Sequence, residues 1–116
     1  PGVPAPRQEV NRGDLYIGVP PGDCGKPRPV LIVQSNWIGP LESRIICPLT
    51  THEEPVAFLR LRIEPTPENG LERTSFIMIE KIMTVPAWRF RQKIGELDSL
   101  AMDIVGTRLA VVLGLA

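Results

Sequence analysis

Hydrophobic and polar residues alternate in short runs along most of this chain, and turns rich in proline and glycine separate the runs. Such runs predict short strands, whereas the longer apolar pattern near the C-terminus predicts a helix. The expected strands cover residues 15–19, 30–33, 44–49, 57–63, 74–82 and 93–97, and the expected helix covers 99–113. This order predicts a mainly β protein with a C-terminal helix, folded as a small β-barrel.

The run Val30-Leu31-Ile32-Val33 is the most apolar of the predicted strands. Its β-branched residues favour a strand over a short helix, and apolar side chains on both faces predict a central strand that is covered on both sides. Pro27 and Pro29 fix the backbone on either side of Arg28, directly before this run. We therefore expect Arg28 to lie at the rim of the core on a stiff segment.

The predicted C-terminal helix has a clear start signal. Asp98 is a good N-cap residue, and Leu97 and Met102 are spaced to form a hydrophobic staple around it. Leu100, Ile104 and Leu109 fall on one apolar stripe, which we expect to face the core, and part of this stripe could serve as a dimer seam. Residues 1–9 hold three prolines and few apolar residues, so we expect a loose leader before a single domain over 10–116.

Composition narrows the function classes without choosing one. The chain has 116 residues, which suits one domain, and its formal net charge is zero, so any nucleic-acid site must come from local placement of cations. No apolar run reaches the ~20 residues of a membrane span. The two cysteines, Cys24 and Cys47, lack metal-type spacing and fit a reducing cytosol. No cofactor or metal is expected, because the chain has one histidine, no phosphate-binding glycine loop and no metal-ligand cluster.

One constellation of polar residues remains. Arg28 begins one predicted strand and Thr50 follows the next, so a hairpin of the two would bring them to the same end. A guanidinium beside a hydroxyl suits a phosphodiester, and RNA carries its own nucleophile, the 2′-OH. The protein then needs only a base, a proton donor and charge stabilisation. Asp23 and His52 are candidate bases, and Arg28 is the candidate stabiliser. On composition alone Arg28 could equally be a rim salt-bridge residue, and Thr50 a strand-end cap.

Five short motifs, in order, resemble one known family. They are Arg12-Gly13-Asp14-Leu15, the segment from Lys26 to Asn36, Cys47-Pro48-Leu49-Thr50, Gly70-Leu71 before Ser75-Phe76-Ile77-Met78, and Ile94-Gly95-Glu96-Leu97. This order is similar to that of the MazF/PemK toxins, the toxin halves of bacterial toxin–antitoxin pairs. The resemblance runs from about Val10 to Leu113, which is nearly the whole chain.

The resemblance implies an SH3-like barrel, a homodimer, and a metal-independent endoribonuclease (an mRNA interferase) that cuts single-stranded RNA at short sequences in the bacterial cytoplasm. It also implies a cognate antitoxin whose extended peptide occupies the RNA groove. Arg28 matches the catalytic arginine of the family and Thr50 its catalytic threonine. Asp23 stands where many members have a glutamate. On the fifth strand Met78 replaces an arginine of the PemK branch, and only Glu80 remains.

Residues around these positions are the expected RNA contacts: Lys26, Gln34, Ser35, Thr51, His52 and Glu80. Two other hypotheses for the function stay open. A related fold occurs in CcdB proteins, which poison DNA gyrase without cutting RNA, although such a binder has no need of the Arg28 and Thr50 motifs. The third hypothesis is a binding-only SH3-like module. The zero net charge and few aromatic residues of the chain would make such a module bind nucleic acid weakly.

Overall fold

The computed structural model describes residues 10–22, 25–39, 41–55 and 58–116, so the predicted leader over 1–9 lies outside the described residues. Short strands and three single-turn 3-10 helices (η1 to η3) precede one α-helix. The elements, in chain order, are β1 (Asp14–Gly18), β2 (Arg28–Ile32), η1 (Asn36–Ile38), β3 (Ser43–Thr50), β4 (Arg60–Ile63), β5 (Ser75–Met78), η2 (Ile79–Lys81), β6 (Met83–Pro86), η3 (Ala87–Arg89), β7 (Phe90–Glu96) and α1 (Ser99–Val112).

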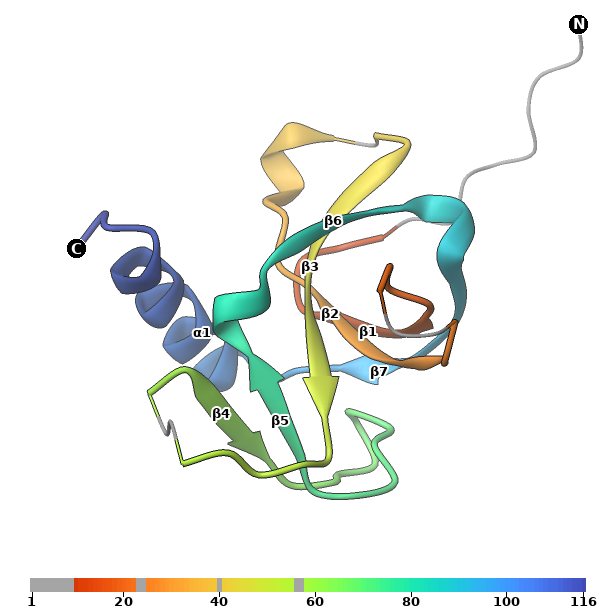
Figure 1. The fold of residues 1–116 in the computed structure, drawn as a ribbon. Helices are drawn as coiled ribbons and strands as arrows, with labels where there is room; N and C mark the ends of the chain where they lie inside the picture. Colours follow the sequence, from red (N-terminus) through yellow and green to blue (C-terminus); the bar gives the residue numbers. More distant parts are fainter. Residues whose placement is uncertain (1–9, 23–24, 40, 56–57) are drawn as a thin grey trace, which may run out of the picture.

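The strands form one strongly curved antiparallel sheet (Figure 1). Their order is β4-β5-β3-β2-β1-β7, and β6 pairs with the first half of β3. The predicted mainly β class with a C-terminal helix is therefore confirmed. The described strands contain no ladder between β4 and β7, so the sheet is barrel-like but not closed.

Strand β2 lies at the centre of the sheet, as its sequence predicts. Val30 and Ile32 pack into one hydrophobic cluster, with Tyr16 and Val85 among its members. Leu31 points to the opposite face, into a larger cluster that also contains the buried residues of α1. A strand that is covered on both faces cannot shift its register without exposing one of the two clusters, so the start of β2 is firmly placed.

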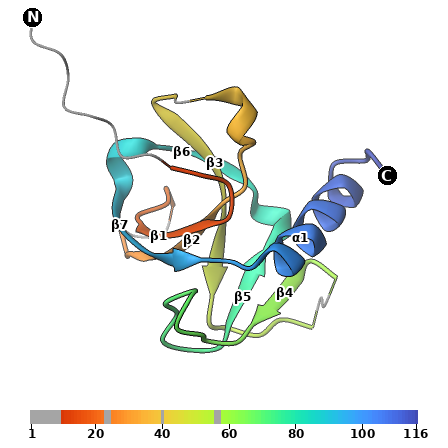
Figure 2. The same cartoon turned by 180° about the vertical axis from the view of Figure 1, so that it is seen from behind.

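The C-terminal helix begins at the predicted cap, where the Asp98 Oδ1 atom accepts a hydrogen bond of 2.8 Å from the Ala101 backbone N–H. The predicted core stripe is wrong in part: Val105 and Leu109 are buried, but Leu100 is 72% exposed and Ile104 is 37% exposed. Helix α1 lies beside the end of the sheet that carries β4 and β5, and β7 leads into it (Figure 2). None of the described helices is both long and apolar enough to cross a membrane.

Three predicted strands differ from the observed ones. The strand expected over 57–63 forms only as β4, after a turn at residues 58–59, and residue 57 lies outside the described residues. The strand expected over 74–82 ends at Met78, where the chain enters η2. Strand β6 follows η2 and is absent from the predicted elements, because it pairs with β3 rather than with a sequence neighbour. Strand β7 begins at Phe90, three residues before its predicted start.

The turn after β4 is held closely against β7. Asn69 is buried, and its side-chain oxygen accepts hydrogen bonds of 3.0 Å from the backbone N–H groups of Thr66 and Leu71. Gly70 has a φ of +68°, and a Cβ atom there would lie 1.9 Å from the Ile94 carbonyl oxygen. At Gly95 a Cβ atom would meet the Glu68 carbonyl oxygen at 2.4 Å. Two glycines thus allow the backbones of the turn and of β7 to touch.

Candidate functional site

Strands β2 and β3 bring Arg28 and Thr50 to the same end of the sheet. The two strands are antiparallel, and Val30 pairs with Pro48, Leu31 with Cys47. Continuing this register by two residues places the first residue of β2 opposite the last residue of β3. The arrangement that the sequence predicts for these two residues is therefore the one that the fold contains.

Arg28 is half-buried between two neighbouring strands. It pairs with Gly18 of β1, and its Nη1 atom donates a hydrogen bond of 3.4 Å to the Leu49 carbonyl oxygen of β3. Pro27 and Pro29 restrict the backbone on both sides, because each proline ring fixes one φ angle. The guanidinium is thus held at the mouth of the barrel on a rigid segment rather than on a flexible loop.

Thr50 ends β3 and begins a tight turn. Its Oγ1 atom accepts a hydrogen bond of 3.1 Å from the His52 backbone N–H, and on its other side it pairs with Phe76 of β5. The hydroxyl therefore has a structural role as a strand-end cap. The hydroxyl still has its own proton to donate, because the bond to His52 uses only an oxygen lone pair.

Two adjoining cavities open at this end of the sheet. The smaller, of about 200 Å³, is called the Thr50 cavity here, and it is lined by Lys26, Pro27, Arg28, Pro29, Leu49, Thr50, Thr51 and Ser75. The larger, of about 310 Å³, is called the side cavity here, and it is lined by Ile17, Pro27, Arg28, Pro29, Thr51, Gly70, Leu71, Glu72, Arg73, Ser75, Gln92 and Ile94. Arg28 lines both, so a ligand in one cavity would lie directly beside a ligand in the other.

Lys26 and Thr51, two of the predicted RNA contacts, line the Thr50 cavity with Arg28. Gln34 and Ser35 do not, because they follow β2 at its opposite end. Gln34 is buried, and its Oε1 atom accepts a hydrogen bond from the Ile45 backbone N–H, while Ser35 caps η1. The fold therefore places these two residues away from the cavities beside Arg28, and their contact with RNA stays a prediction.

Two other predicted residues, Glu80 and His52, stand apart from the two cavities. Glu80 lies in η2 and forms a bidentate ion pair with Arg60, at 2.6 Å between Arg60 Nη2 and Glu80 Oε2. The fifth strand has already ended there, which removes Glu80 from the surface beside Thr50. The His52 side chain is exposed and lies 3.3 Å from a Glu54 carboxylate oxygen. Asp23 lies outside the described residues.

Several lining residues are absent from the sequence-based site, among them Ser75, Arg73 and Gln92. Ser75 is buried at the start of β5 and lines both cavities. The rule that places Thr50 beside Arg28 could have found it, since the start of β5 lies beside the end of its antiparallel neighbour β3. Arg73 and Gln92 line the side cavity from the turn before β5 and from β7. No sequence signal marks them, because their position depends on how that turn packs on β7.

The remaining candidate groups do not supply a nucleophile or a metal site in the described part of the chain. Cys47 is buried inside β3, and burial raises the pKa of its thiol to about 12. The thiol is therefore protonated at neutral pH and acts as a small core residue. The described histidine, cysteine, aspartate and glutamate residues form no group of three or more that could hold a metal ion.

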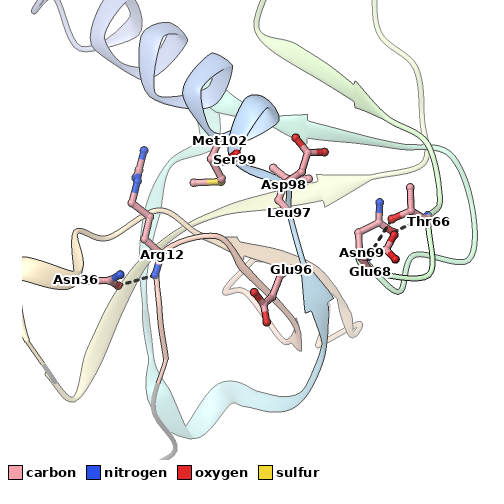
Figure 3. A pocket seen from close by; sticks show the side chains of 10 residues that line it. All are labelled: Arg12, Asn36, Thr66, Glu68, Asn69, Glu96, Leu97, Asp98, Ser99 and Met102. Atoms are coloured by element: carbon pink, nitrogen blue, oxygen red, sulfur yellow. Dashed lines mark hydrogen bonds between the residues drawn. The ribbon is translucent and has the colours of Figure 1, made fainter.

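A third cavity, of about 650 Å³, lies elsewhere, where β7 meets α1. Figure 3 shows Arg12 on one side of it and Glu68 on the other, with Glu96 between them. Its ten lining residues include three carboxylates and one guanidinium, and none of them lines the two cavities beside Arg28. This charge balance repels a polyanion, so size alone does not make it the site for a phosphodiester.

Comparison with known proteins gives the family of the chain. Residues 11–113 match the family described as the PemK-like, MazF-like toxin of type II toxin–antitoxin systems. A probable endoribonuclease MazF of Mycolicibacterium smegmatis is 40% identical, and the match covers 92% of this chain and 99% of that protein. The endoribonuclease EndoA of Bacillus subtilis is 32% identical over 91% of this chain and 96% of that protein.

A solved structure agrees with the fold. It is an endoribonuclease in complex with its cognate antitoxin from a mycobacterial species, with a TM-score of 0.75 and 24% sequence identity. The match covers 93% of this chain and 98% of that one. The resemblance inferred from the five sequence motifs is confirmed over nearly the whole chain. The chain therefore belongs to the PemK-like, MazF-like family of type II toxins.

Proposed function

We propose that this toxin cuts single-stranded RNA without a metal ion, at the site formed by Arg28 and Thr50. One observation carries the proposal: the register of β2 and β3 brings a rigidly held guanidinium and a hydroxyl to the mouth of the same cavity. Lys26 adds a second cation at the rim. This local positive charge offsets the zero net charge of the chain, which gives no general attraction for RNA.

The chemistry that suits this site uses the substrate's own nucleophile. The 2′-oxygen attacks the adjacent phosphorus as its proton passes to a base. The bond from phosphorus to the 5′-oxygen then breaks, and that oxygen takes up a proton as it leaves. The products are a 2′,3′-cyclic phosphate and a 5′-OH end. Arg28 stabilises the charge that builds on the phosphoryl oxygens, and Thr50 donates a hydrogen bond to one of them. Asp23 and His52 stay predicted candidates for the base.

The enzyme class agrees with the relatives. The sequence predicts an endoribonuclease toxin, and this class is confirmed by the family match and by the names of the two relatives that cover nearly the whole chain. The gyrase-poisoning alternative and the binding-only module are not favoured. A cleavage complex of gyrase with DNA, formed without loss of RNA, would be the observation that restores the first of them.

The partners follow from the same proposal. The solved complex of an endoribonuclease with its cognate antitoxin supports an antitoxin partner for this chain. We infer that an extended antitoxin peptide occupies the groove that holds RNA, that the toxin acts as a homodimer, and that it works in the bacterial cytoplasm. An antitoxin in that groove would compete with RNA for the two cavities beside Arg28.

The direct test is to incubate the purified protein with a long single-stranded RNA in excess EDTA and to map the new ends. We expect discrete cuts at one shared short sequence, because base contacts on unpaired nucleotides select the site. Intact RNA, with a folded protein confirmed by circular dichroism, would contradict the proposed activity. Cuts that appear only when a divalent metal is added back would contradict the metal-independent mechanism.

Replacing Thr50 by alanine separates its catalytic role from its capping role. We expect Thr50→Ala to lower the single-turnover cleavage rate by roughly 10- to 100-fold, because a hydrogen bond to the reacting phosphate is lost. The lost cap to His52 costs only about 1 kcal/mol of unfolding free energy. Thr50→Ser keeps the hydroxyl and should retain most of the rate. If both variants cut RNA as fast as the wild type, Thr50 is only a strand-end cap.

A further inference from the structure

We propose that the side cavity holds a nucleobase next to the scissile phosphate, and that Gln92 reads the edge of this base. The inference rests on the proposed RNA cleavage at Arg28 and Thr50, and it assigns the sequence preference to a named residue. The two cavities share Arg28, Thr51 and Ser75 in their lining. A phosphate bound in one therefore places an attached nucleoside at the entrance of the other.

The lining of the side cavity suits a base better than a second phosphate. Its walls are apolar, formed by Ile17, Pro27, Pro29, Leu71 and Ile94. Its charged residues are the carboxylate of Glu72, which repels a phosphate, and the cations Arg28 and Arg73. Proline rings and aliphatic side chains provide an apolar surface against which an unpaired base can pack, and the polar groups of the lining fix its orientation.

Strand β7 is irregular at the residues that it contributes to this cavity. Tyr16 pairs with Lys93 and Gly18 with Phe90, so Ile17 of β1 lies opposite two residues of β7, Arg91 and Gln92. A second register shift falls at Ile94, between the pairs made by Lys93 and Gly95. Bulges occur beside active sites because the extra residue changes the direction of a side chain. Both β7 residues of the side cavity, Gln92 and Ile94, lie at these shifts.

Among the described residues that line the side cavity, Gln92 alone carries a carboxamide. It is exposed, and its amide makes no hydrogen bond within the described part of the chain, so its donor and its acceptor are both available to a ligand. The two groups lie in one plane and match a base edge that presents a donor beside an acceptor, as adenine does. Thr51 and Ser75 can add single contacts, but neither offers this paired geometry.

The test compares the wild type, Gln92→Ala, Gln92→Glu and the control Thr84→Ala, which changes an exposed residue of β6 that lines neither cavity. Each protein cuts a pool of RNAs with random bases around the mapped site, and the base frequencies at the cuts are counted. We expect Gln92→Ala to lower the preference at one nucleotide flanking the cut by roughly ten-fold, the discrimination of one bidentate contact. Gln92→Glu, which loses the amide donor, should change which base is preferred. Thr84→Ala should match the wild type.

A second readout does not depend on cleavage. Oligonucleotides with a 2′-deoxy sugar at the cut cannot react, and their binding is measured by fluorescence anisotropy with each of the four bases at the flanking position. We expect Gln92→Ala to bind all four with similar affinity, while Arg28→Ala, although inactive, keeps the order of preference. If Gln92→Ala does not fold, Gln92→Glu is compared with the wild type in its place.

The outcomes separate the inference from the proposed function. If the wild type cuts RNA and Gln92→Ala keeps both its base frequencies and its order of binding, the inference is overturned and the proposed function stands. If the loss of preference appears at a nucleotide remote from the cut, the placement of the base is wrong. If the wild type neither cuts nor binds single-stranded RNA, both proposals fail.

Discussion

Replacing Arg28 by alanine is expected to lower RNA cleavage by at least about 100-fold, with little change in stability. The guanidinium offers a planar set of donors at the place where charge develops on the phosphoryl oxygens, and removing one such stabilising group typically costs 10²- to 10³-fold in rate. Its hydrogen bond to the Leu49 carbonyl is long, at 3.4 Å, so its loss should change the unfolding free energy by about 1 kcal/mol or less. Single-turnover cleavage and chemical denaturation measure the two effects.

Two further variants test whether the effect depends on the planar guanidinium at this position. Arg28→Lys keeps the positive charge but loses the planar guanidinium, and it should recover only part of the rate. Arg62→Ala removes an exposed arginine of β4 that pairs with Glu64 and lines neither cavity, so it should cut like the wild type. If Arg62→Ala and Arg28→Ala lose activity equally, general attraction of RNA by cations explains the result and Arg28 has no special role.

Replacing Gly70 by alanine is expected to lower the unfolding free energy by about 2–4 kcal/mol. Its φ of +68° disfavours a side chain by about 1–2 kcal/mol, and the new Cβ atom would lie 1.9 Å from the Ile94 carbonyl oxygen, where only a backbone movement can relieve the clash. Because Gly70 and Ile94 also line the side cavity, the same movement should disturb the base preference. Urea denaturation gives the stability, and cleavage mapping gives the preference.

Gly39→Ala is the matched control for this second prediction. Gly39 has a similar φ of +82°, but a Cβ atom there would meet no atom of the described residues within 4 Å. Its replacement should therefore cost only the conformational term of about 1–2 kcal/mol. A Gly70→Ala protein that is no less stable than Gly39→Ala would show that the turn and β7 are not held together by backbone contact.

The parts of the site that could be predicted are those that depend on local sequence and on one pairing rule. Four apolar residues in a row predict that β2 is covered on both faces, and the two hydrophobic clusters around it confirm this. The neighbouring ends of β2 and β3 follow from antiparallel pairing of consecutive strands. Arg28 and Thr50 could thus be placed together from the sequence, and Ser75 could have been placed with them.

The other parts depend on long-range packing. Strand β6 pairs with β3, although β4, β5 and η2 lie between the two strands in the sequence. The periodicity of the sequence could therefore not reveal this strand. The register shifts that bring Gln92 and Ile94 to the side cavity arise only when β7 pairs with β1. Gln34 and Arg28 belong to the same sequence motif, but this motif spans the whole of β2. Arg28 begins the strand and Gln34 follows its other end, so the two residues lie apart.

Helix α1 shows a further limit of sequence patterns. Apolar residues occur on several sides of it, so the pattern alone does not select the face that packs on the sheet. The strands place Val105 and Leu109 inside the larger hydrophobic cluster and leave Leu100 largely exposed. The cap at Asp98 could be predicted because it needs only the local backbone and one side chain.

Attack by the 2′-OH is tested with a DNA oligonucleotide that carries a single ribonucleotide at the mapped cut site, incubated with the protein in EDTA. We expect one cut, directly 3′ of the ribose, with a 2′,3′-cyclic phosphate on one product and a 5′-OH on the other. The matching all-deoxy oligonucleotide should stay intact. Cleavage of the all-deoxy strand, or a 5′-phosphate on the product, would contradict attack by the 2′-OH at the site of Arg28 and Thr50.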